Sequence, residues 1–227
     1  FNYTYYWKIK VNDGFETVES EVRQFVIFDS PPQIWRHYTE NVVMSVDISS
    51  NGQYTVAGSD KVYLFRDNNT PIWSYYTGGV VDSVAISSDG EYIVVGSRDT
   101  RIYFFDKDSS TPIWTYDESP LNEHSLSISA DGEYIVLNDG SKIYLFDKDS
   151  STPVWIYSSW EGINSVSLSA DGNYIVAGGD DDNDNSSVYL FSKSSSTPLW
   201  SYDTGDAVKL VTISSDGEYI SVGSDDY

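Results

Sequence analysis

The densest group of potential metal ligands in this sequence is an acidic run at residues 180–185, Asp-Asp-Asp-Asn-Asp-Asn. Carboxylate oxygens at alternating positions suit a hard cation such as Ca²⁺. Asp180, Asp182 and Asp184 are therefore the candidate ligands of a Ca²⁺ ion. The glycine and the distal glutamate of an EF-hand loop are missing from the run. A solvated acidic loop is thus the alternative interpretation.

Residues suited to nucleophilic catalysis are few. The chain has two histidines, His37 and His124, no cysteine, and no Gly-x-Ser-x-Gly elbow. Paired carboxylates could act in glycoside hydrolysis, but among 35 acidic residues some pair is certain to occur. We therefore expect no enzymatic activity, and no cofactor other than a possible Ca²⁺ ion.

The elements that would position these residues come from a repeat that runs along most of the chain. A Ser-(Ser/Ala)-(Asp/Asn)-Gly motif alternates with a Pro-x-Trp motif, and the period is about 40 residues. The glycines of the first motif are Gly52, Gly90, Gly132, Gly172 and Gly217. This is the period of a four-stranded propeller blade.

Each repeat contains four short runs of β-branched and aromatic residues separated by turn residues. In one repeat these runs are 83–87, 91–97, 101–105 and 113–116. No segment has helical periodicity. The sequence therefore predicts an all-β fold, a β-propeller of four-stranded antiparallel blades. About five repeats are visible, and we expect them to be part of a ring of more blades.

Two families share this pattern. The first half of residues 83–114, SVAISSDGEYIVVGS, resembles a WD-repeat blade, although the Trp-Asp dipeptide is absent. The second half, with Phe-Asp-x-x-Ser-Ser-Thr-Pro-x-Trp, is similar to the tryptophan-bearing repeats of pyrroloquinoline-quinone-like propellers. The resemblance covers residues 33–224 and implies the propeller fold. It implies no particular activity, because propellers host many unrelated ones.

Residues 1–29 do not fit the repeat. The segments 5–14 and 20–28 resemble the last two strands of a fibronectin type III-like or other immunoglobulin-like domain. Two strands cannot bury a core by themselves, so we expect the chain to be part of a longer modular protein. The expected organisation is this domain end at 1–29, a linker at 30–32, and propeller repeats at 33–227 that are incomplete at the C-terminus.

Comparing the repeats with one another separates packing positions from candidate binding positions. The tryptophans recur in every repeat, so we expect Trp73, Trp114, Trp155 and Trp200 to be buried at equivalent sites. His37 takes the place of a recurring tyrosine, which indicates packing. The repeats diverge at the loops opposite the Asp-Gly turns, and variable loops on a fixed scaffold suit binding. The candidate binding face comprises Asp82, Arg98, His124, Asn164 and Lys209. Divergence of unselected loops is the alternative.

The net charge of −22 excludes nucleic acid as a partner, because phosphates would be repelled. No apolar run approaches the roughly 20 residues of a membrane-spanning helix, so we expect no membrane insertion. The favoured function is a non-catalytic module outside the cell or at its surface. It would bind a protein, a glycan or copies of itself. The alternatives are an intracellular WD-repeat-like scaffold and a part of a secreted hydrolase or lyase.

Overall fold

The computed structural model describes the backbone of residues 2–7, 10–12, 17–19 and 23–28, and both backbone and side chains of residues 35–117, 125–159, 162–180 and 186–225. The chain divides into two compact units, Phe1–Arg36 and His37–Tyr227. In the first, β1 (Asn2–Trp7) pairs with β4 (Arg23–Phe28), and β2 (Lys10–Asn12) pairs with β3 (Thr17–Glu19), both antiparallel. The immunoglobulin-like assignment of this unit stays a prediction.

The second unit consists of consecutive antiparallel sheets, in which the strand order is the chain order. Blade 1 holds β5 (Ser45–Ile48), β6 (Tyr54–Gly58), β7 (Val62–Arg66) and β8 (Pro71–Tyr75); blade 2 holds β9 (Val81–Ile86), β10 (Tyr92–Ser97), β11 (Arg101–Asp106) and β12 (Trp114–Asp117); blade 3 holds β13 (Ser125–Ile128), β14 (Tyr134–Asn138), β15 (Lys142–Asp147) and β16 (Trp155–Ser158); blade 4 holds β17 (Ser165–Leu168), β18 (Tyr174–Asp180), β19 (Ser186–Ser192) and β20 (Trp200–Asp203). Two further strands, β21 (Val208–Ile213) and β22 (Ile220–Ser224), form a fifth sheet, which we call blade 5.

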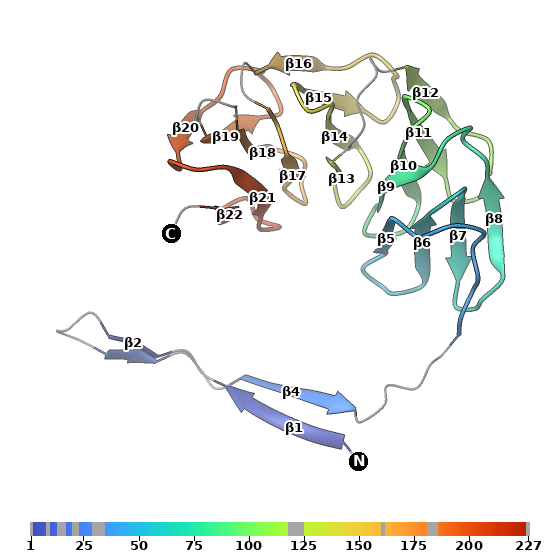
Figure 1. Cartoon of the computed structure of the whole chain (residues 1–227), viewed down its shortest axis with the longest axis horizontal. Coiled ribbons are helices and arrows are strands. Elements are labelled where there is room, and N and C mark those ends of the chain that lie inside the picture. Colours follow the sequence, from blue (N-terminus) through green and yellow to red (C-terminus); the bar gives the residue numbers. More distant parts are fainter. Residues whose placement is uncertain are drawn as a thin grey trace. The chain divides into compact units, whose positions relative to one another are not determined.

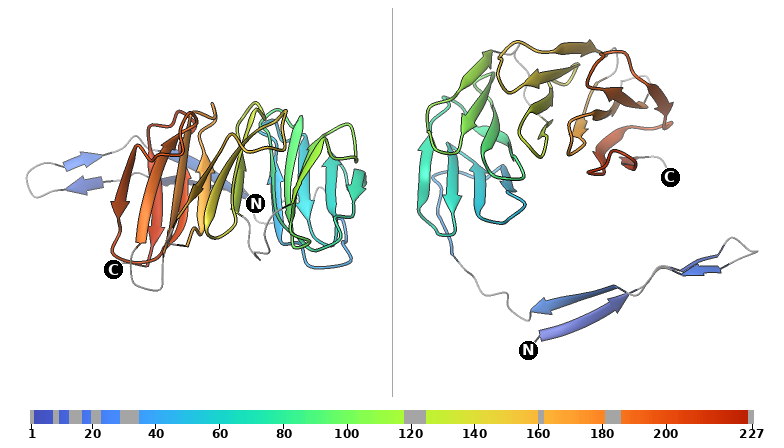
Figure 2. Two further views of the ribbon diagram at one scale, coloured as in Figure 1. Left: turned by 90° about the horizontal axis from the view of Figure 1, so that it is seen from above. Right: turned by 180° about the vertical axis from the view of Figure 1, so that it is seen from behind.

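The first strands of successive blades lie next to one another (Figure 1), as in a propeller. Figure 2 shows the sheets standing side by side, so that each packs a face against its neighbour. The predicted all-β propeller of four-stranded blades is confirmed. We call the strands of each blade A to D in chain order. The A–B turns and C–D loops lie at one end of the strands, the turn face, and the other connections lie at the opposite end, the loop face.

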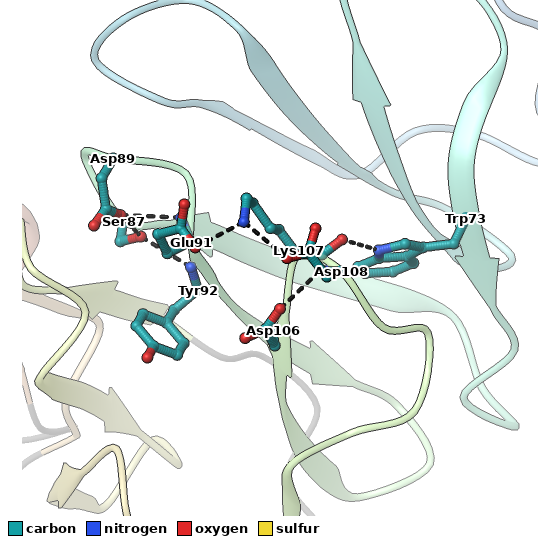
Figure 3. A network of polar contacts seen from close by, with 8 residues as sticks. All are labelled: Trp73, Ser87, Asp89, Glu91, Tyr92, Asp106, Lys107 and Asp108. Atoms are coloured by element: carbon teal, nitrogen blue, oxygen red, sulfur yellow. Dashed lines mark hydrogen bonds and ion pairs between the residues drawn. The ribbon is translucent and has the colours of Figure 1, made fainter.

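The recurring Ser-x-Asp-Gly motif closes each A–B turn by side-chain hydrogen bonds. In blade 2 the Ser87 hydroxyl donates to Asp89 at 2.6 Å and accepts from the backbone N–H of Tyr92 at 3.0 Å, while Asp89 accepts from the N–H of Glu91 (Figure 3). The glycine at Gly90 has a φ of +81°, and a Cβ there would lie 2.6 Å from the Tyr54 ring of the preceding blade. The motif therefore serves both the turn and the contact between blades.

A chain of backbone hydrogen bonds joins these turns from blade to blade. The N–H groups of Ser50, Ser88, Ala130 and Ala170 donate to the carbonyl oxygens of Ser88, Ala130, Ala170 and Ser215 in turn, at 2.8–3.1 Å. The turn face is thus the uniform side of the molecule, as the recurrence of its residues predicted.

The C–D loops show the turn chemistry that their Asp and Ser residues suggest. In the first of the two Asp-Lys-Asp-Ser-Ser loops, Asp106 accepts from the N–H of Asp108 at 2.8 Å. Lys107 donates to Glu91 at 2.7 Å and to Asp108 at 3.0 Å (Figure 3), and these hydrogen bonds raise the pKa of Lys107. Its backbone carbonyl accepts the indole N–H of Trp73 from the preceding blade at 2.7 Å. The loops are therefore structural.

The tryptophans dock each blade onto the next one. The indole N–H groups of Trp73, Trp114 and Trp155 donate to the carbonyl oxygens of Lys107, Lys148 and Lys193, one blade further on, at 2.7–3.0 Å. These three rings are half-buried, and Trp200 is 41 % exposed, so the expectation that all four are buried is wrong. Trp200 is the most exposed of the four because, within the described residues, no third strand of a following blade lies against β20. His37 packs on Tyr63 and Phe65 as predicted.

Candidate functional site

A hollow of about 580 Å³ opens on the loop face where blades 3, 4 and 5 meet. Its lining residues come from the loop-face ends of strands and from the connections between them: Ser125, Asn138, Gly140, Ile163, Asn164, Asp180 and Lys209. The lining of the hollow thus combines side-chain amides, a carboxylate, an ammonium group and a hydroxyl group. Asp180, which the sequence analysis selected as a metal ligand, lines this hollow together with Asn164 and Lys209, which it selected as part of a binding face.

The connection between blades 3 and 4 is held against both blades by hydrogen bonds. Asn164 donates its side-chain amide to Asp180 at 2.5 Å and to the carbonyl oxygen of Val208 at 2.9 Å. Asn138, almost fully buried, accepts from the N–H of Ser125 and donates to the carbonyl oxygen of Ile163. The amide groups on this side of the hollow are therefore held in fixed orientations before any ligand binds.

Two glycines allow this connection to approach β18. The N–H of Gly162 donates to the carbonyl oxygen of Asp180 at 2.6 Å. A Cβ on Gly179 would lie 1.6 Å from the carbonyl oxygen of Gly162, a distance at which the backbone has to move. Glycine is required at 179 because only a hydrogen atom fits between the two segments.

Lys209 brings the positive charge of the hollow. Its side chain is 54 % exposed and lies 3.2 Å from Asp225, which is similarly exposed. Such an exposed ion pair contributes little to stability, so the ammonium group can exchange Asp225 for a ligand at small cost. Together with Asp180 it places opposite charges on a polar lining, which suits a ligand rich in hydrogen-bonding groups.

The other candidate residues are placed elsewhere or fall outside the described part. Asp82 and Arg98 belong to blade 2, where their side chains form an ion pair with a nitrogen–oxygen distance of 3.6 Å. They do not line the hollow. His124, Asp182 and Asp184 lie outside the described residues. The structure therefore brings together three of the candidates and separates two.

The predicted Ca²⁺ site in the acidic run at residues 180–185 stays a prediction that titration can test. Titration with Ca²⁺ followed by calorimetry is expected to show weak binding, with a Kd on the order of 10⁻⁴–10⁻³ M, as in extracellular modules with incomplete ligand cages. Asp182→Ala and Asp184→Ala should each reduce the heat. Heat that both variants leave unchanged would contradict a site in this loop.

Sequence reasoning missed a set of buried Asp–Tyr pairs at the B–C loops of the loop face. The hydroxyl of Tyr144 donates to Asp139 at 2.6 Å, and the other carboxylate oxygen of Asp139 accepts from the backbone at Ser141 and Lys142. Burial opposes ionisation of Asp139, but these hydrogen bonds hold its pKa below the usual value. Blades 1 and 2 repeat the pair with Asp60–Tyr63 and Asp99–Tyr103. The sequence feature that could have predicted these pairs is an aspartate three to five residues before the tyrosine of the third strand.

The tyrosines of these pairs should make the fold sensitive to alkali. Burial and the hydrogen bond with Asp60 raise the pKa of Tyr63 to about 12, and burial with the hydrogen bond to Asp99 raises that of Tyr103. Because the folded state favours the neutral phenol, the stabilisation is complete below pH 10 and is lost as the pH rises through about 12. Urea unfolding at pH 9 and pH 11.5 should show this loss.

The matched control for the alkaline experiment is Tyr63→Phe. This variant should be less stable at pH 9 and should lose less stability between the two pH values. An equal loss in the variant and in the parent would assign the alkaline sensitivity to other groups.

No helix in the described part of the chain is long and apolar enough to cross a membrane.

The comparisons with known proteins agree with the fold. Among solved structures, hydrazine synthase of Kuenenia stuttgartiensis superposes with a TM-score of 0.69 at 18 % identity, covering 81 % of this chain and 56 % of that one. The chain thus spans little more than half of that protein chain, and a likeness at this identity shows the fold alone. No curated protein matches.

Two family models match the sequence itself. Residues 151–190 match the WD domain, G-beta repeat. Residues 26–164, more than half of the chain, match the family described as outer membrane protein assembly factor BamB. Both matches agree with the resemblance to WD-repeat and quinoprotein-like blades. The chain belongs to this BamB family of propeller-repeat proteins.

Proposed function

We propose that this chain is a non-catalytic binding module, and that the hollow on its loop face binds a protein partner outside the cell or at its surface. One observation carries the proposal: apart from Ser125, which recurs as Ser45, Ser83 and Ser165, the polar residues that line the hollow differ from blade to blade, whereas the turn face repeats the same hydrogen bonds in each blade. A fixed scaffold with variable loops is the usual basis of a binding surface.

The chemistry of the lining indicates the kind of partner. Asn164 and Asp180 offer donors and acceptors in fixed places, and Lys209 adds an exposed donor, which suits a polar peptide segment or loop. The net charge of −22 favours a neutral or basic partner, since like charges would slow association. The family description names a factor in the assembly of outer membrane proteins, which supports a protein as the partner and a location outside the cytoplasm.

The experiment is a screen of immobilised peptide and glycan arrays with the purified chain, followed by titration of the hits. Peptides with neutral, amide-rich segments should be retained, and Lys209→Ala should weaken their binding about tenfold because the ammonium group no longer donates to their carbonyl oxygens. Arg66→Ala is the matched control, because it also removes one exposed positive charge but lies at the turn-face end of β7. Equal losses in both variants, or retention of glycans alone, would contradict the proposal.

A further inference from the structure

Three segments of the chain match the pattern Asn-x-Ser/Thr, in which x is not proline. They begin at Asn2, Asn68 and Asn185. In exported proteins this pattern marks asparagines whose side-chain amide accepts an N-linked glycan. The acceptor has to lie on the surface, because a glycan is bulky and hydrated. The three segments can therefore be distinguished by their places in the fold.

Only the segment at Asn68 lies in an exposed loop within the described part of the chain. Residues 68–70 belong to the C–D loop of blade 1, between β7 and β8, and all of them are exposed. The segment at Asn2 lies inside β1, which pairs with β4. The third residue of the remaining segment, Ser187, lies in β19, which pairs with β18 on one side and β20 on the other. A transferase could reach that serine only if the sheet opened.

The exposure of this loop is a property of its place in the blade. A threonine ends the C–D loop of each of blades 1 to 4, and it is exposed in all of them. Blades 2 and 3 each stand between two neighbouring blades, so their loops show that a neighbouring blade does not cover this position. The four threonines are Thr70, Thr111, Thr152 and Thr197.

Two hydrogen bonds hold the side chain of Asn68 beside Thr70. Its Oδ1 accepts from the backbone N–H of Thr70 at 2.8 Å, and its Nδ2 donates to the carbonyl oxygen of Arg66 at 2.9 Å. In blades 2 to 4 a serine hydroxyl oxygen accepts the same threonine N–H at 3.0 Å, so the turn needs only an oxygen at this position. Among these four loops, blade 1 alone adds an amide nitrogen there. One of its two hydrogens is engaged with Arg66, and the other can be replaced.

From the motif, its exposure and this geometry we infer that Asn68 is the acceptor of an N-linked glycan. The donor is a lipid-linked oligosaccharide diphosphate. A bond forms between Nδ2 of Asn68 and C1 of the first sugar, the bond between C1 and the diphosphate oxygen breaks, and the diphosphate leaves with the electron pair. One amide proton passes to a base of the transferase. The remaining amide hydrogen can still donate to the carbonyl oxygen of Arg66.

The place of Asn68 keeps the glycan away from the hollow. Its loop lies on the turn face, at the opposite end of the strands from the loop face. A glycan there would make the turn face bulky and hydrated and would leave the loop face open to a partner. Transfer to Asn68 requires export of the chain, so it rests on the location outside the cytoplasm that is proposed above.

The test expresses the full chain behind a signal peptide in eukaryotic cells and analyses the secreted protein by mass spectrometry. The fragment that contains Asn68 should gain the mass of one N-linked glycan. Treatment with peptide N-glycosidase should remove the glycan and leave an aspartate in place of Asn68. Asn68→Gln and Thr70→Ala should each abolish the modification. Thr70→Ser should keep it, because serine also completes the pattern.

Asn69→Gln is the matched control, because it changes the neighbouring amide of the same loop and leaves the pattern intact. The glycan should persist in this variant. An unmodified Asn68 in the secreted chain would overturn the inference, and so would an equal loss of the glycan in Asn69→Gln and Asn68→Gln. If a variant fails to fold, the fragment of the unsubstituted chain decides alone. Peptide binding by the unglycosylated chain tests the function of the hollow separately, so either proposal can fail without the other.

Discussion

Replacing Trp114 by alanine is expected to lower the free energy of unfolding by about 3 kcal/mol, near the lower end for emptying an aromatic site because the ring is only half-buried. The ring stacks on Phe104 at a centroid distance of 4.9 Å and on Phe146 at 5.5 Å. Its indole N–H also bonds the carbonyl oxygen of Lys148, which would be left without its partner. The Phe146 contact and this hydrogen bond join blades 2 and 3, whereas the Phe104 contact lies within blade 2.

Trp200→Ala is the matched control, because the same side chain is removed from the same strand position, where the described residues place no third strand of a following blade against it. Its cost should be less than about 1 kcal/mol, as for an exposed site. Urea unfolding followed by circular dichroism would measure both variants. Similar costs at Trp114 and Trp200 would show that the docking contact between blades contributes little.

The second large effect is expected at Gly179. Gly179→Ala would place a Cβ 1.6 Å from the carbonyl oxygen of Gly162, so β18 and the connection at 162–163 have to separate. We expect a loss of about 3–5 kcal/mol in the free energy of unfolding, the range in which a buried overlap cannot be relieved by a side chain. The hydrogen bond from Gly162 to Asp180 would be lost with it, and the hollow would change shape.

Gly223→Ala provides the control for this prediction. Gly223 also lies in a second strand, β22, and a Cβ there would have its nearest neighbour at 3.9 Å. Its substitution should change stability by less than about 1 kcal/mol. Thermal unfolding of both variants would test the difference, and a mild effect at Gly179 would show that the connection relaxes without unfolding the blade.

The blades could be predicted from the sequence because their determinants are local. Ser87, Asp89 and Tyr92 close a turn within six residues of one another, so the motif specifies the turn wherever it recurs. The alternation of apolar residues in each strand likewise acts over neighbouring positions. Their repetition about every 40 residues then leaves few folds other than a propeller.

The site depended on contacts between residues that the sequence separates. Asn164 reaches Val208 across 44 positions, and nothing near either residue in the sequence indicates the other. The exposure of Trp200 had the same origin: its residue type matches Trp114, and only the absence of a strand against it in the described structure distinguishes the two. Local chemistry determined the blade, because turns and alternation are short-range. Packing between blades decided what lies buried and what lines the hollow, because each surface is completed by a neighbour about 40 residues away.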